Sequence, residues 1–138
     1  MRWLGVLLLV ISSLDAGHSA HAEEKCGHET GIRLSGTTDA PWTIHIQFNP
    51  KDMPLNVAFD AIVTVCSQSE RAPTRLTVDA TMPAHGHGMN YGLNAVRVDG
   101  RTYEVKNFLL HMPGVWRLEV TVYENNKPHR FTHDVNLQ

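Results

Sequence analysis

The sequence predicts an all-β protein, an immunoglobulin-like antiparallel β-sandwich of about seven strands. Apolar and polar residues alternate with a period of two over several short runs, which is typical of half-buried strands. Turn-forming residues separate the runs at short spacing, as in antiparallel sandwiches. Neither a helical period of apolar residues nor a βαβ alternation competes with this interpretation.

The first strong strand is expected where Trp42, Ile44, Ile46 and Phe48 alternate with polar residues. Six later runs repeat the pattern, and their inward residues are expected to form the core. These runs are 59–65, 76–78, 96–98, 103–110, 116–122 and 131–135.

Turn chemistry separates the runs. The segments 49–52, 67–73 and 125–128 are polar or contain proline. Asp99-Gly100 is a strong hairpin signal. Pro113-Gly114 fits the centre of a type II turn, in which glycine supplies the positive φ. Whether 31–36 is a further strand stays open.

The N-terminus has the pattern of a secretory signal peptide over residues 1–22. Arg2 precedes an apolar stretch, and Ala20-His21-Ala22 is a typical cleavage site. The stretch is shorter than the roughly 20 residues of a membrane span. We expect a single exported domain over 23–138, in the periplasm or secreted; an uncleaved anchor is the alternative.

Composition narrows the class of function. The formal net charge is −2, and no basic stripe occurs, so nucleic acid is not an expected partner. Seven of the nine histidines lie in 23–138. No G-x-S-x-G elbow or other hydrolytic arrangement is present, so we do not expect an enzyme.

The two cysteines, Cys26 and Cys66, suit a disulfide in an oxidising compartment. Free thiols, or Cys26 as a ligand beside His28, are the alternatives. If 31–36 is a separate strand, strand counting places the two cysteines at opposite ends, which argues against the bridge.

The most informative stretch is Met82-Pro83-Ala84-His85-Gly86-His87-Gly88-Met89. In an extended segment, residues two apart point the same way, so His85, His87 and Met89 would share one face. The intervening glycines leave the other face bare. Imidazole and thioether together suit copper, above all Cu(I).

A second pair, His111-Met112, precedes the Pro113-Gly114 turn. Successive connections in an antiparallel meander alternate between the two ends. Counting strands from 81–92 through Asp99-Gly100 to 111–114 therefore places both motifs at one end. Copper as Cu(I), Cu(II) or both is the expected ligand, with His85, His87, Met89, His111 and Met112 as its binding residues.

Simpler interpretations remain beside this one. The loop histidines can be solvated, with Met82 and Met112 capping the core. His45, His129 and His133 are expected at the surface rather than at a metal. Zinc is a poorer match because thioether is not among its usual ligands. A blue-copper centre would need a cysteine in one of the motifs.

The two blocks, 82–89 and His111-Met112-Pro113-Gly114-Val115-Trp116-Arg117-Leu118, together with Tyr103, resemble the YtkA-like domain, which is related to FixH-like proteins. The resemblance covers about residues 58–125. It implies a small extracytoplasmic β-sandwich and a role in copper handling or in assembly of copper-containing oxidases. It also implies that the five candidate ligands stand at positions where such domains would bind a metal.

We therefore expect a periplasmic copper-binding protein that acts as a carrier, buffer or metallochaperone. Its partners would be the copper ion and a copper-requiring protein or membrane oxidase complex. The alternative is a metal-free immunoglobulin-like interaction module that assists assembly of a membrane or respiratory complex. A copper redox enzyme is a third, weaker hypothesis.

Overall fold

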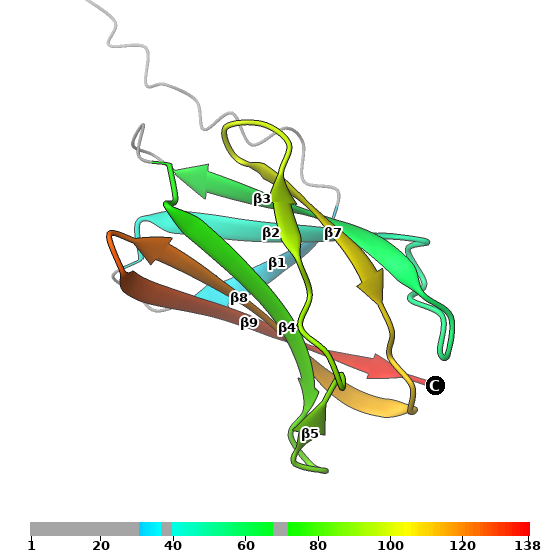
Figure 1. Cartoon of the computed structure of the whole chain (residues 1–138). Helices are drawn as coiled ribbons and strands as arrows, with labels where there is room; N and C mark the ends of the chain where they lie inside the picture. Colours follow the sequence, from blue (N-terminus) through cyan, green and yellow to red (C-terminus); the bar gives the residue numbers. More distant parts are fainter. Residues whose placement is uncertain (1–30, 37–39, 68–71) are drawn as a thin grey trace, which may run out of the picture.

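The computed structural model describes residues 31–36, 40–67 and 72–138, and its described part is built from strands without a helix (Figure 1). The all-β prediction is confirmed. Nine antiparallel strands form one curled sheet rather than the seven expected. They are β1 (Ile32–Gly36), β2 (Trp42–Asn49), β3 (Phe59–Ser67), β4 (Arg75–Met82), β5 (His87–Gly88), β6 (Ala95–Arg97), β7 (Thr102–Phe108), β8 (Gly114–Glu124) and β9 (Lys127–Leu137).

The strand order is β5-β4-β8-β9-β1-β2-β3-β7-β6. β1 joins the two halves of the sheet because it changes partner along its length. Residues 32–34 pair with β2, whereas Ser35 and Gly36 pair with β9. The half made of β4, β8 and β9 thereby curls over the half made of β2, β3 and β7 (Figure 1).

The core lies inside this curl and consists largely of residues that period-two alternation predicts. Val96 and Val98 were also expected to contribute to it, but they are 51 % and 56 % exposed, because β6 lies at the edge of the sheet. Trp42, Ile44, Ile46 and Phe48 are all buried along β2. Phe48 meets Phe59 and Phe108 in an aromatic cluster with ring centroids 5.3–5.6 Å apart. Burial of each such side chain contributes roughly 1.5–3 kcal/mol, so this inward face accounts for much of the stability.

All seven predicted strands are present, and the two additional ones are β1 and β5. β5 has only two residues and pairs with the end of β4. From β5 the chain runs back along β4 towards β6, which pairs with β7 (Figure 1). β5 and β6 therefore lie on one continuous segment, which passes from the half of the sheet that contains β4 to the half that contains β7.

Of the described turns, the β6–β7 turn lies at the predicted residues, and the β8–β9 turn is shorter than predicted. The Asp99 side chain accepts hydrogen bonds from the backbone N–H groups of Arg101 and Thr102 at 2.9 Å, and these bonds lower its pKa. Asn125 and Asn126, both with positive φ, make the β8–β9 turn alone. Pro128 was predicted within that turn but lies in β9, opposite Tyr123.

Cys66 is disulfide-bonded, and the other cysteine, Cys26, lies outside the described residues. β1 is a strand in its own right, so the expectation that a strand there would exclude a disulfide is wrong. β1 is five residues long against eight in β2, and it does not run the whole length of the sheet. The proposed signal peptide, 1–22, also lies outside the described residues.

Candidate metal centre

The two histidine- and methionine-containing segments meet at one end of the sheet, at the bottom of Figure 1. β4 ends at Met82, and β8 begins at Gly114. These strands are antiparallel neighbours, with Thr81 opposite Arg117. The segment that leaves β4 therefore lies beside the segment that enters β8, as predicted. The count behind that prediction omitted β5, which leaves the placement unchanged because β5 and β6 follow one another within the same crossing of the sheet.

The first segment begins with a tight turn, 82–86, before it enters the short strand β5. The backbone N–H groups of His85 and Gly86 both donate to the carbonyl oxygen of Met82, at 3.1 and 3.0 Å. Gly86 has a φ of +66°, which a residue with a side chain rarely adopts. The expectation that simple alternation aligns His85 with His87 is wrong, because the Met82 carbonyl curls the chain between them.

The turn nevertheless brings imidazoles together. The ring centroids of His85 and His87 lie 5.7 Å apart, and those of His87 and His111 lie 5.4 Å apart with 25° between the ring planes. His87 is thus the middle of a row of three rings from two segments. His85 is exposed, whereas His87 and His111 are half-buried.

The row of rings is a juxtaposition of donors rather than a finished coordination sphere. Over the described ranges, no group of three or more His, Cys, Asp or Glu residues is arranged to hold a metal ion. Thioethers are a separate class of donor, and they lie in the same two segments.

The methionines differ in their accessibility. Met89 and Met112 are half-buried against the edge of the core. Met82 is only 1 % exposed, and its Cε is 3.1 Å from the place where a Cβ on Gly114 would lie. Gly114 therefore leaves the space that the Met82 side chain fills, and its φ of +121° agrees with the predicted glycine-dependent turn.

Trp116 is the residue whose importance here sequence reasoning missed. Its place in the alternation of β8 predicted only a core role, and it is indeed 0 % exposed. Its indole also stands nearly perpendicular to two imidazoles, 5.4 Å from His111 and 6.3 Å from His87. Its Nε1–H donates to the carbonyl oxygen of Met112 at 2.8 Å.

Carboxylates have other roles. Asp79 accepts a hydrogen bond from the backbone N–H of Ala80, and Asp99 closes the β6–β7 turn. Asp134 is paired with Arg117 through two hydrogen bonds at 2.7 and 2.8 Å, which lower the pKa of its carboxyl group. The accessible donors of the candidate centre are therefore imidazoles and thioethers.

One of the remaining described histidines, His129, is buried rather than at the surface. His129 is only 4 % exposed because its ring packs edge-to-face on Trp42, with centroids 5.1 Å apart. Its Nε2 lies 3.9 Å from a Glu124 carboxylate oxygen. His45 is half-buried, and its Nδ1 has no hydrogen-bond partner among the described residues. The surface position expected for His129 is therefore wrong, whereas His45 and His133 are both half-buried.

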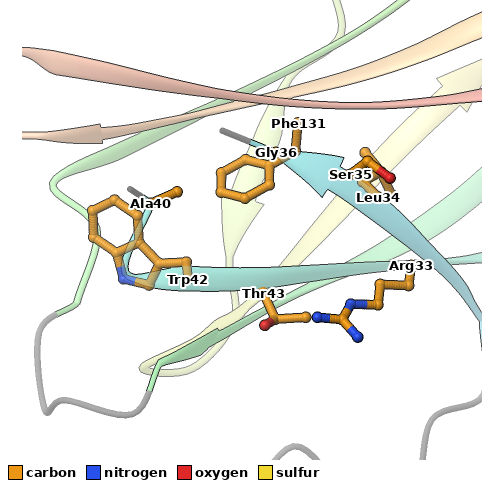
Figure 2. Close-up of a pocket in the computed structure, with 8 residues that line it drawn as sticks. All are labelled: Arg33, Leu34, Ser35, Gly36, Ala40, Trp42, Thr43 and Phe131. Carbon is orange, nitrogen blue, oxygen red and sulfur yellow. The ribbon is translucent and has the colours of Figure 1, made fainter. Parts of the chain in front are cut away.

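A separate hollow opens where β1 leaves β2 for β9 (Figure 2). Trp42 and Phe131 form much of its wall, and Arg33 is its one charged residue among those drawn. No histidine, cysteine, methionine or carboxylate belongs to its described lining. This hollow therefore does not compete with the histidine row as a metal site.

Comparison with known proteins adds no assignment, since no protein-family profile, curated protein or solved structure matches the chain. Within the described residues, no helix is long and apolar enough to cross a membrane.

Proposed function

We propose that this protein is a periplasmic copper-binding protein that carries, buffers or delivers the ion. Its site would be formed by His85, His87 and His111 with thioether from Met89 or Met112. The observation that carries the proposal is the stacking of His87 on His111, two imidazoles from separate segments 5.4 Å apart.

The donor chemistry selects the metal. Thioether sulfur favours Cu(I), and imidazole accepts both Cu(I) and Cu(II). Zinc is usually held by Cys, His and carboxylate, and the carboxylates discussed above are committed elsewhere. Copper is therefore the cargo that fits, and a mixed His/Met site suits transport better than catalysis.

The local structure can adapt to an ion. His85 is exposed and lies beside Gly86, where no atom lies within 4 Å of the Cβ position. The exposed His85 side chain therefore has solvent around it in which to rotate towards His87. His87 and His111 are half-buried and provide the more rigid part of the site.

The cellular setting belongs to the same proposal. The chain is a member of the YtkA-like group with an immunoglobulin-like sandwich over 23–138, exported by a signal peptide at 1–22. A disulfide at Cys66 supports an oxidising compartment. A copper-requiring protein or a membrane oxidase complex would receive the ion.

The deciding experiment is an anaerobic Cu(I) titration of the protein against a chromophoric chelator. We expect one equivalent to bind, and we expect the His85→Ala/His87→Ala double variant to lose most of the affinity while remaining folded. His45→Ala/His133→Ala removes two histidines outside the row and is the matched control. Wild-type affinity in the His85→Ala/His87→Ala variant would reject the site.

The second candidate is a metal-free interaction module, favoured by the outer edge of the sheet. Val96 of the terminal strand β6 is 51 % exposed, and Val98 just beyond it is 56 % exposed. An edge strand with apolar residues can accept a strand from a partner. Absence of copper, in protein purified without a histidine tag from copper-supplemented cells, would favour this function.

A further inference from the structure

We propose that Trp116 is a positioning residue of the copper site, which holds the His111–Met112 segment against the ring of His87. The inference rests on the proposed copper binding. It assigns to a buried tryptophan a role beyond filling the core.

The first observation is a hydrogen bond to a segment outside the strands. The connection between β7 and β8, 109–113, has no strand partner of its own. Two of its carbonyl groups are held: Leu110 accepts from the backbone N–H of Asn56 at 2.9 Å, and Met112 accepts from Trp116 Nε1–H at 2.8 Å. A buried indole N–H needs an acceptor, so this bond also satisfies Trp116.

The second observation is that one indole contacts an imidazole from each segment. Its plane makes angles of 78° with the ring of His111 and 75° with the ring of His87. Such edge-to-face contacts are a preferred geometry for aromatic rings. Trp116 itself is fixed within β8, where its backbone pairs with Val135 of β9.

These two contacts explain how a ligand set drawn from two segments keeps its geometry. Groups that contact metal ligands from outside fix the orientation of those ligands, and their loss typically costs about 10- to 100-fold in metal affinity. Trp116 satisfies that description for His87, His111 and the backbone of Met112 at once. Its removal would free the second segment while leaving every proposed donor atom in the chain.

The test uses Trp116→Phe, which keeps an aromatic ring but loses the N–H donor. Trp42→Phe is the matched control, because Trp42 is also buried in the core, at the start of β2, and contacts His129 instead. In the anaerobic Cu(I) competition we expect Trp116→Phe to bind about 10- to 100-fold more weakly than wild type. Trp42→Phe should remain within about twofold of wild type, because it touches none of the site.

A second measurement on the unmodified protein tests whether copper binds beside Trp116. On addition of Cu(I), the indole Nε1–H resonance of Trp116 should shift, and that of Trp42 should not. This readout also decides the question if Trp116→Phe fails to fold: a shift supports the role, and an unmoved resonance at saturation overturns it.

The outcomes distinguish this inference from the function on which it rests. If wild type binds Cu(I) and Trp116→Phe binds it equally well, the positioning role is overturned and copper binding stands. If wild type binds no copper, the proposed function fails, and the role of Trp116 fails with it.

Discussion

The imidazoles of His87 and His111 lie 5.4 Å apart, centroid to centroid, although one follows β4 and the other precedes β8. The contact exists because β4 and β8 are antiparallel neighbours, with Thr81 opposite Arg117. It converts two short motifs into one cluster of metal-binding side-chain types. The first prediction tests this contact directly.

His111→Ala should weaken Cu(I) binding by about tenfold or more. Removal of a group that only supports a metal ligand already costs about that much affinity, so removal of a ligand should cost at least as much. His111 is the only imidazole that the second segment brings to the row, so its removal leaves that segment with the Met112 thioether alone. Competition titration measures the change. His133→Ala, on β9, is the control, and equal affinities for the two variants would show that His111 is not a ligand.

Met112→Leu should lower Cu(I) affinity more than Cu(II) affinity, because thioether sulfur is the softer donor and favours the reduced ion. Leucine has nearly the volume of methionine, so the free energy of unfolding should change by less than about 1.5 kcal/mol. Parallel titrations with the two ions, with thermal unfolding as the folding control, check both parts. Unchanged Cu(I) affinity would remove Met112 from the ligand set, and the same variant at Met89 then tests the other thioether.

Gly114→Ala should destabilise the fold by about 1–3 kcal/mol, since alanine is strained at a φ of +121° and its Cβ would lie 3.1 Å from Met82 Cε. Chemical denaturation measures the loss. Gly92→Ala is the matched control, because a Cβ there meets no atom within 4 Å. Similar stability of the two variants would contradict the tight approach of Met82 to Gly114.

Arg117→Met should raise the pKa of Asp134, because the guanidinium supplies the hydrogen bonds and positive charge that lower it. A carboxyl whose pKa is lower in the folded than in the unfolded state stabilises the fold above its unfolded pKa. That contribution disappears as the pH falls through the folded pKa, below the ordinary value of 3.8. As the pH falls through the folded pKa of Asp134, the free energy of unfolding of the variant should therefore decrease less than that of the wild type.

A carbon-detected NMR titration of the carboxyl groups would follow Asp134 in the wild type and in Arg117→Met. Asp60 is the internal control, since a different cation, Lys106, lowers its pKa. A pKa of Asp134 that stays low without Arg117 would show that another group stabilises the carboxylate.

Much of the fold could be predicted from the sequence because period-two alternation is a local property. The seven predicted strands and the inward residues of β2 agree with the structure, and so does the positive φ of Gly114. β5 could not be predicted, since its two residues, His87 and Gly88, are too few to show a period. The burial of His129 was missed because it depends on Trp42, which belongs to a distant strand.

By itself, the sequence determined which residue types are available for chemistry: imidazoles and thioethers in two short segments beside turn-forming glycines. Only the tertiary structure decided that His87 faces His111, that the turn after Met82 draws His85 towards His87, and that Trp116 contacts both segments. The physical reason is that each residue's side chain alone decides which metal-binding atom it offers. The distance between the two segments instead depends on the pairing of β4 with β8. That pairing forms only when the chain between them folds through β5, β6 and β7.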